Sequence, residues 1–145
     1  MQPRPSVSII VPAFNEAAII SENLGVICEY LETIENRYRW ELIVVNDGST
    51  DDTGMLINEF ASTRPNVVAL HHAINFQLGQ ALRYAFNNAR GDYFVTFDAD
   101  LSYSPDHIGR LLDKITDSNA KVVIASPYME GGRTTRVPRR RKVMS

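Results

Sequence analysis

The sequence predicts an α/β fold in which a mostly parallel sheet carries helices on both faces. Short apolar, β-branched runs alternate along the chain with stretches whose apolar residues recur every three or four positions, the spacing of one helix face. The run ELIVVN at 41–46 is continuously apolar, as expected of a strand covered on both faces. Such alternation is typical of parallel sheets whose strands are joined by helical crossovers.

Five strands are predicted to alternate with four helices, and no internal repeat interrupts them. The predicted strands are 6–11, 41–46, 66–70, 92–97 and 121–126. The predicted helices follow the apolar stripes of 20–34 and 78–89, the capping residues that precede about 52–62, and the stripe of 108–115.

Proline, glycine and cysteine residues mark particular positions in these elements. Pro12 is expected to end the first strand, and Gly91 is expected at the C′ position after the third helix. Ser104 and Pro105 predict a cap followed by proline at the first helical position. Cys28 falls at a core spacing of the first helix, which indicates a buried structural thiol rather than a nucleophile.

The composition is that of an ordinary globular domain. The chain has 145 residues, of which 44% are hydrophobic and 22% are charged, and this length fits one domain. No apolar run approaches the roughly 18 residues that a membrane-spanning helix needs. The start does not resemble a signal peptide, and the single cysteine excludes an internal disulfide and fits a reducing compartment.

Charge is unevenly distributed along the chain. Residues 1–130 carry nine bases against 17 acids, a net charge of −8, whereas residues 131–145 carry six bases and no acid. We expect no nucleic-acid binding, because the body is acidic and no aromatic residues interleave with the arginines of the tail. Two interpretations of the basic tail remain open: a solvated segment, or contact with anionic lipid or phosphate.

Three strand ends carry polar clusters: PAFNEA after the first strand, NDGSTDD after the second and DADLSYSPD after the fourth. A parallel sheet brings the carboxyl ends of its strands to one rim, where ligands bind in α/β proteins. The acids expected to face that crevice are Glu16, Asp47, Asp51, Asp98 and Asp100. Like charges repel at such a rim unless a cation or hydrogen-bond donors compensate them.

Asp98 and Asp100 form the sharpest pair at this rim. Residues i and i+2 of an extended segment point the same way, so both carboxylates can reach one point. Magnesium is commonly held by one or two carboxylates together with substrate phosphates, which predicts a divalent metal site bridged to a nucleoside diphosphate. The alternative is that Asp100 starts a turn and Asp98 is a solvated strand end.

Asp47 and Glu16 each allow two interpretations. Asp47 can accept hydrogen bonds from a nucleobase or a ribose, or it can make an Asx-turn or helix cap, which better describes Asp51 and Asp52. Glu16 can face the ligand or complement the dipole of a helix in its first turn. Glycine-rich dinucleotide and P-loop motifs are absent from the sequence, which argues against dehydrogenases and P-loop enzymes.

Taken together, the three clusters resemble the N-terminal, nucleotide-sugar-binding half of the family 2 inverting glycosyltransferases, which have a Rossmann-like A-type fold. The matching pieces are VSIIVPAFNEA, ELIVVNDGSTDDT, NFQLGQALRYAFNNARGDYFVTFDADLSYSP and ASPYMEGG. Within that family the arrangement looks most like polyprenol-phosphate sugar synthases of the dolichol-phosphate mannose synthase type. RKVMS at 141–145 also resembles a later segment of those enzymes.

The resemblance implies a role for each matching residue. Pro12, Phe14 and Glu16 would line the nucleoside pocket, and Asp47 would contact the base. In the Asp-x-Asp motif, Asp98 and the Ala99 backbone would contact the donor sugar and pyrophosphate, and Asp100, with Asp98, would hold Mg²⁺ or Mn²⁺. Arg141 would meet phosphate.

The sequence departs from the synthase pattern at three places. Ser102 stands where a Gln is common, which puts one metal contact in doubt. Pro127 replaces an arginine that would serve as a phosphate-binding cation, and Asn75-x-Gln77-Leu78 stands where Asn-x-Gly-Lys is common. These departures bear on the synthase subtype more than on the family.

The implied function is metal-dependent, inverting transfer of a sugar from a UDP- or GDP-sugar to a polyprenyl phosphate, in cell-envelope glycan synthesis. The alternatives are transfer to a saccharide hydroxyl and a non-catalytic nucleotide-sugar-binding remnant. Residues 1–130 would form the donor-binding domain, and 131–145 a basic tail or the start of an acceptor-side segment in a truncated chain that transfers poorly by itself. A cytoplasmic location is expected, with peripheral contact at the cytoplasmic membrane face in the full-length protein; the oligomeric state stays open.

Overall fold

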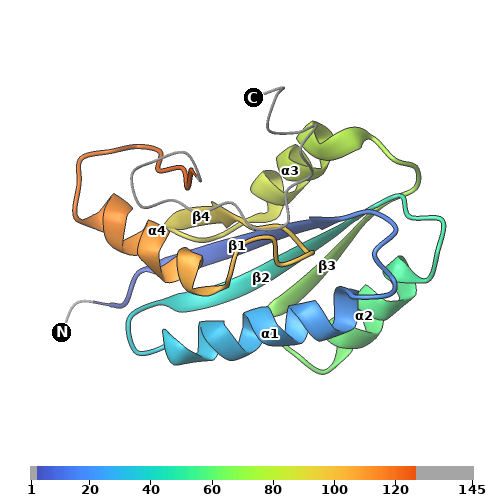
Figure 1. Ribbon diagram of the computed structural model, residues 1–145, viewed down its shortest axis with the longest axis horizontal. Coiled ribbons are helices and arrows are strands. Elements are labelled where there is room, and N and C mark those ends of the chain that lie inside the picture. Colours follow the sequence, from blue (N-terminus) through green and yellow to red (C-terminus); the bar gives the residue numbers. More distant parts are fainter. Residues whose placement is uncertain (1–2, 127–145) are drawn as a thin grey trace.

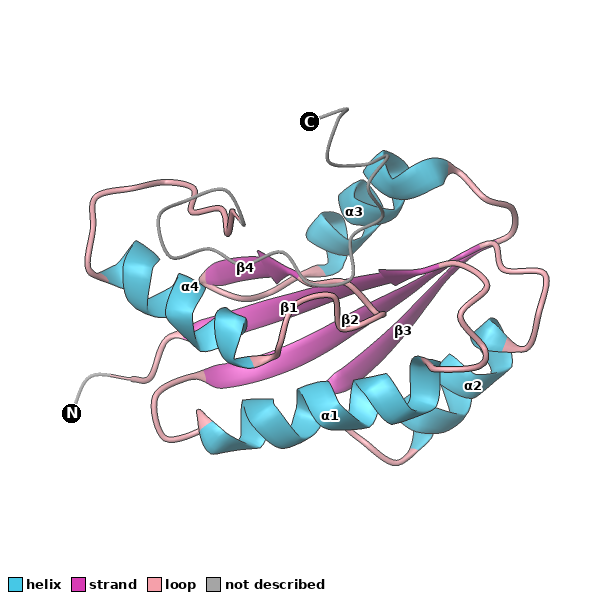
Figure 2. Cartoon of the chain, in the orientation of Figure 1, coloured by secondary structure: helices cyan, strands magenta, loops and turns pink. Residues whose placement is uncertain are grey.

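The structure is a computed structural model that describes residues 3–126 (Figure 1). Arg141, Pro127 and the tail at 131–145 therefore lie outside the described residues. Strands and helices alternate in the described part, which confirms the α/β prediction (Figure 2). In chain order the elements are β1 (Ser6–Ala13), α1 (Ile20–Thr33), β2 (Arg39–Asp47), α2 (Thr53–Ser62), β3 (Val67–His72), α3 (Gln77–Asn88), β4 (Tyr93–Thr96) and α4 (Asp106–Thr116).

Every strand pair in the described part of the sheet is parallel, and the strand order is β3-β2-β1-β4. The chain therefore moves outward from β1 to β3 and then returns to place β4 on the other side of β1. This reversal makes β1 and β4 the switch point of the sheet, the place where ligands bind beyond the carboxyl ends of the strands.

Helices cover both faces of the sheet, as predicted. Three helices, α1, α2 and α4, pack on one face in a large apolar cluster that includes Val11, Leu24 and Leu112 (Figure 1). The other face is covered by α3, whose Ala81 and Ala85 pack against Ile10, Ile43 and Val45. Alternate residues of β1 and β2 thus enter two different cores, which explains why the run at 41–46 is apolar without a break.

The apolar stripe predicted for the first helix is buried as expected. Ile20, Leu24, Ile27 and Leu31 are fully buried, and Cys28 lies among them with 5% exposure. Burial raises the pKa of the Cys28 thiol to about 11. A thiol that resists ionisation is a poor nucleophile, so the structural interpretation of Cys28 is confirmed.

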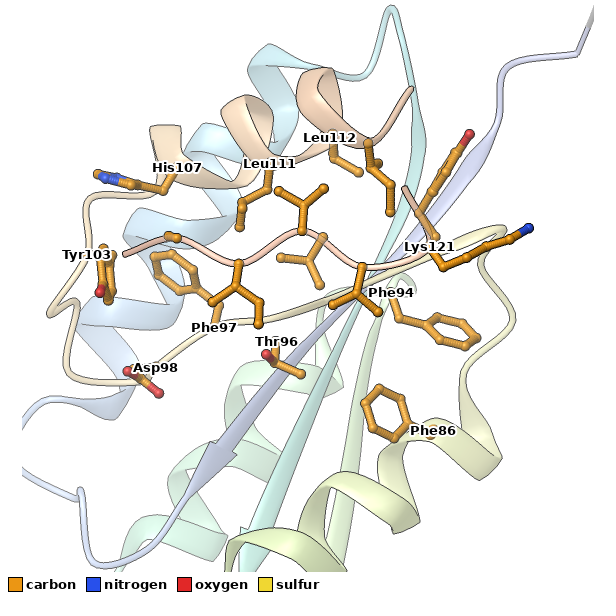
Figure 3. Close-up of a pocket in the computed structure, with 17 residues that line it drawn as sticks. Phe86, Phe94, Thr96, Phe97, Asp98, Tyr103, His107, Leu111, Leu112 and Lys121 are labelled. Atoms are coloured by element: carbon orange, nitrogen blue, oxygen red, sulfur yellow. The ribbon is translucent and has the colours of Figure 1, made fainter. Parts of the chain in front are cut away.

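The predicted fifth strand is wrong, because the structure has no strand at 121–126. Residues 121–125 instead line an apolar cavity beside β4 and α4, and Val122 and Ile124 are 72% and 78% exposed (Figure 3). A β-branched run favours an extended chain, but a strand also needs a hydrogen-bonded partner. The apolar composition of a segment does not show whether a neighbouring strand is available to pair with it.

Several predicted boundaries also differ from the structure. Pro12 does not end β1, which runs on to Ala13, because the pairing of β1 with β4 stops at Ile10 and leaves one edge of β1 free for a residue without an N–H. The helix after Ser104 begins one residue late, at Asp106, with Pro105 at the N-cap.

The apolar stripe predicted for the third helix is only partly buried. Leu78 and Phe86 are 59% and 41% exposed, although the stripe predicted them in the core. Gly91 is not in the C′ position, because α3 ends at Asn88 with Ala89 as its C-cap. Gly91 instead lies so close to Ser8 that an added Cβ would stand 2.5 Å from the Ser8 nitrogen. The glycine therefore serves close strand packing rather than helix termination.

Candidate functional site

The segments that follow β1 and β2 are joined by hydrogen bonds at the rim of the sheet. The Asn15 side chain accepts from the Thr50 amide at 2.8 Å, and the Asn15 amide donates to the Ser49 hydroxyl at 3.0 Å. Glu16 donates its backbone N–H to the Thr53 hydroxyl at 2.8 Å. Two of the three predicted polar clusters therefore form one surface.

Asp51 supports this surface from within the loop. Its carboxylate accepts from the Thr53 amide at 3.0 Å and from the Ala17 amide at 3.2 Å. The hydrogen bonds from Thr53, the side-chain one first, lower the pKa of the Asp51 carboxyl. The turn-forming interpretation of Asp51 is thus confirmed, and its carboxylate already accepts hydrogen bonds from the protein's own backbone.

The third polar cluster follows β4 and contains the paired carboxylates. Asp98 and Asp100 are exposed and the intervening Ala99 is buried, and the Asp100 carboxylate is close enough for its charge to raise the pKa of Asp98. Asp100 accepts from Ser102 through one oxygen, Oδ1, at 2.9 Å from the amide and 2.6 Å from the hydroxyl. Ser102, which departs from the family pattern, therefore orients the Asp100 carboxylate.

Asn23 of α1 donates its side-chain N–H to the Ala99 carbonyl at 2.9 Å. This bond ties the paired-carboxylate segment to a helix 76 residues earlier in the chain. Sequence reasoning missed Asn23, because nothing local to that residue signals a contact so distant in sequence. The Ser102 bond had a local signal, since a hydroxyl two residues after an Asp commonly closes a turn.

Electrostatic interactions connect the ends of β1 and β4. Burial raises the pKa of the Glu16 carboxyl, and the charges of Asp100 and Asp51 raise it further. Burial also raises the pKa of Asp98, with the Asp100 charge adding to the effect. These carboxylates are therefore held in a field that disfavours their ionised forms, as a site built to receive a cation is expected to be.

Within residues 3–126, no three His, Cys, Asp or Glu side chains converge closely enough to hold a metal by themselves. Asp98 and Asp100 are nevertheless the residues that could hold a magnesium or manganese ion, since such an ion commonly takes one or two carboxylates and completes its shell with substrate phosphates and water. The carboxylate oxygens are hard ligands, and the Asp100 oxygen that Ser102 does not contact remains for a cation.

Asp47 stands apart from the other acids and is almost wholly buried. Its Oδ1 accepts from His72 Nδ1 at 2.7 Å and from the Phe76 amide at 3.0 Å. Neither an Asx-turn nor a helix cap describes these contacts. His71 turns the other way, toward Asn58, so the two adjacent histidines share no site, as expected from a strand.

Gly48 allows the loops after β2 and β3 to meet. Its φ is +67°, and an added Cβ would stand 2.0 Å from the Ile74 carbonyl carbon and 2.3 Å from the Asn75 nitrogen. This backbone contact brings the Phe76 amide within reach of Asp47. The remaining predicted nucleoside-pocket residues lie at the end of β1, where Pro12 is half-buried and Phe14 is 44% exposed.

A cavity of about 490 Å³ lies beside the paired carboxylates, between β4, α4 and residues 121–125 (Figure 3). Asp98 lines one end, near Tyr103 and His107, whose rings are in edge contact. Most of the other lining residues are apolar. The cavity therefore joins an apolar surface to the charged rim.

Replacing Asp98 by Asn is expected to raise the melting temperature at neutral pH. The raised pKa means that ionised Asp98 destabilises the fold above that pKa, whereas below the unfolded value of about 3.9 the cost is absent. The stabilisation should therefore decrease as the pH falls below the raised pKa, and it should be absent below the unfolded value. Thermal unfolding between about pH 3 and pH 8 measures it.

Asp92→Asn is the matched control with the opposite sign. Hydrogen bonds from Ser6 lower the pKa of Asp92, so the ionised carboxylate stabilises the fold above the unfolded value. Its replacement should lower the melting temperature at neutral pH, and the loss should vanish as the pH falls through the lowered pKa. Parallel pH profiles for the two variants would contradict the prediction.

Comparison with solved structures places the parallel α/β sheet in the class of glycosyltransferases with the A-type fold. A mannosyltransferase from Pyrobaculum calidifontis, solved in complex with GDP-Man and Mn²⁺, superposes with a TM-score of 0.70 at 28% identity, over 86% of this chain and 37% of that one. The chain belongs to Glycosyl transferase family 2, whose family model matches residues 8–144.

Two curated relatives are named for transfer involving dolichol phosphate or dolichyl phosphate. A dolichol-phosphate mannosyltransferase of Pyrococcus furiosus is 32% identical over 96% of this chain and 38% of its own length. A dolichyl-phosphate β-glucosyltransferase of Trichomonas vaginalis is 33% identical over 85% of this chain and 39% of its own length. The chain thus spans less than half the length of either relative. Among residues 3–126, the helices are too short or too polar to cross a membrane.

Proposed function

We propose that the protein takes part in the transfer of a sugar from a nucleoside-diphosphate sugar to a polyprenyl phosphate, with inversion and with a divalent metal. The observation that carries the proposal is the placement of the exposed Asp98 and Asp100 directly after β4, at the switch point of the sheet. The names of the relatives, which act on dolichyl phosphates, support the choice of acceptor.

Each residue at the rim has a part in holding the donor. Asp100, with Asp98, would hold Mg²⁺ or Mn²⁺, which supplies Lewis-acid stabilisation of the charge that develops on the diphosphate. Asp98 and the Ala99 backbone would contact the sugar and pyrophosphate, and Asn23 and Ser102 orient that segment. Pro12, Phe14 and Glu16 would line the nucleoside pocket, with Asp47 on the base.

A polyprenyl phosphate suits this site because its attacking oxygen is already anionic. The reaction then needs no protein base, and the rim has only to orient donor and acceptor. The apolar cavity that ends at Asp98 is a surface that suits a lipid chain. Contact with the cytoplasmic face of a membrane belongs to the same proposal, because the acceptor is a membrane lipid.

Two other functions are tested against this one. Transfer to a saccharide hydroxyl needs a carboxylate base near the acceptor oxygen. A nucleotide-sugar-binding remnant needs neither acceptor nor turnover. Both alternatives keep the donor rim and differ from the proposal only at the acceptor.

The deciding experiment combines calorimetry with a transfer assay. Titration of UDP and GDP with and without Mn²⁺ should show metal-dependent binding, and radiolabelled UDP- and GDP-sugars should label polyprenyl phosphate rather than an oligosaccharide. Equal nucleotide affinity with and without Mn²⁺ would contradict a metal-dependent donor site. Label found in the oligosaccharide rather than in the polyprenyl phosphate would contradict the proposed acceptor.

A further inference from the structure

We propose that the His72–Asp47 pair makes the site selective for uridine nucleotides over guanosine nucleotides. This inference deepens the proposed function and rests on it, because it takes Asp47 as the residue that meets the base. The selectivity depends on which carboxylate oxygen of Asp47 is free to accept a hydrogen bond from a ligand and which is already bonded to the protein.

The protein fills one oxygen of the Asp47 carboxylate. Oδ1 accepts from both His72 Nδ1, at 2.7 Å, and the Phe76 amide, at 3.0 Å. A carboxylate oxygen has two lone pairs, so these two donors saturate Oδ1. Among residues 3–126, no hydrogen bond goes to Oδ2. One acceptor oxygen of Asp47 is therefore left for a base.

Packing holds the two donors in place. The His72 ring stacks on Tyr84 of α3 with centroids 5.0 Å apart and planes 13° apart, and it meets the Phe76 ring edge-on at 5.0 Å. The Phe76 amide is held by the close backbone contact at Gly48. Neither donor can leave Oδ1 without a change in the surrounding packing. A ligand is therefore expected to find Oδ1 occupied and only Oδ2 available.

Uracil and guanine present different donors to a carboxylate. Guanine carries an imino and an amino N–H side by side, which match the two oxygens of a free carboxylate. Uracil carries a single imino N–H between two carbonyl oxygens. A carboxylate with one free oxygen satisfies uracil, but it leaves one guanine donor without a partner. An unsatisfied donor in a protein site weakens binding by about ten-fold or more.

The first test compares UDP, GDP and CDP by calorimetry on the unaltered chain in the presence of Mn²⁺. UDP is expected to bind at least about ten-fold more tightly than either of the other two. Equal affinity for UDP and GDP, or tighter binding of GDP, would overturn the inference while leaving nucleotide binding intact. Failure of all three nucleotides to bind would instead overturn the proposed function.

The second test is Asp47→Asn, which should move the preference from UDP toward CDP. The Phe76 amide can only donate, so it should hold the Asn carbonyl oxygen in the Oδ1 position and leave the NH₂ in the Oδ2 position. A donor at that point opposes the uracil imino N–H and suits the cytosine ring nitrogen, which is an acceptor. The ratio of UDP to CDP affinity should fall by about ten-fold or more.

Asp92→Asn is the matched control, because Asp92 also accepts bonds at a strand end but lies beside Ser6, at the amino ends of β1 and β4 and so at the opposite end of the strands from Asp47. It should leave the nucleotide ratios unchanged. An equal loss of UDP and CDP affinity in Asp47→Asn would show that Asp47 only supports the fold, which overturns the inference. If that variant does not fold, the UDP-to-GDP ratio of the unaltered chain decides the question.

Discussion

Replacing Asp100 by Asn is expected to abolish metal-dependent nucleotide binding. Asp100 accepts both Ser102 bonds through Oδ1, and the carbonyl oxygen of Asn can accept the same two bonds. The turn should therefore survive, and the variant should lose only the charge and the second oxygen. Because a hard divalent cation prefers carboxylate oxygens, we expect UDP or GDP affinity in Mn²⁺ to fall by about 100-fold.

Calorimetry of Asp100→Asn with and without Mn²⁺ measures this effect, and a thermal melt checks that the fold survives. Asp52→Asn is the matched control, because Asp52 is an exposed acid of the neighbouring rim loop that makes no capping bond. The control should bind nucleotide within about two-fold of the unaltered chain. Unchanged, metal-dependent binding in Asp100→Asn would show that Asp100 does not ligate the metal.

Replacing Gly48 by Ala is expected to destabilise the protein by about 2–4 kcal/mol and to disrupt the base-binding end of the site. Gly48 has φ +67°, and its Cβ would stand 2.0 Å from the Ile74 carbonyl carbon. Backbone atoms cannot move aside as the end of a flexible side chain can. The loop after β3 should therefore shift and carry the Phe76 amide away from Asp47.

Urea denaturation measures the loss of stability, and UDP titration measures the loss of nucleotide affinity. Gly79→Ala is the control, because Gly79 lies in α3 with open space around its missing Cβ. That change should be neutral or stabilise by up to about 1 kcal/mol, as alanine does in a helix. If Gly48→Ala were as stable as Gly79→Ala, the contact between the two loops would not be needed for the fold.

Local pattern was sufficient to predict most of the architecture. The stripe from Ile20 to Leu31 predicted α1, because only one face of a helix can be buried against a sheet. The continuous apolar run of β2 predicted a strand with a core on either side, and both cores are present. The apolar run that ends in Asp98 and Asp100 predicted β4 for an equally local reason, and that strand is present.

Where the pattern failed, the outcome depended on a partner elsewhere in the chain. The run at 121–126 has the composition of a strand, but residues 121–125 line a cavity beside β4. Leu78 and Phe86 continue a helical stripe, but the sheet beneath α3 covers only part of it. Periodicity predicts which side chains share one face of a helix. It does not predict how much of that face the sheet will cover.

The sequence by itself determined the alternation of strands and helices, the family, and the polar clusters that directly follow β1, β2 and β4. These features follow from the order and spacing of residues near one another in the chain. Only the tertiary structure decided that Asn23 ties down Ala99 and that His72 and Phe76 occupy one oxygen of Asp47. Each of these hydrogen bonds joins residues from different elements, and its 2.7–3.0 Å geometry exists only after those elements have packed.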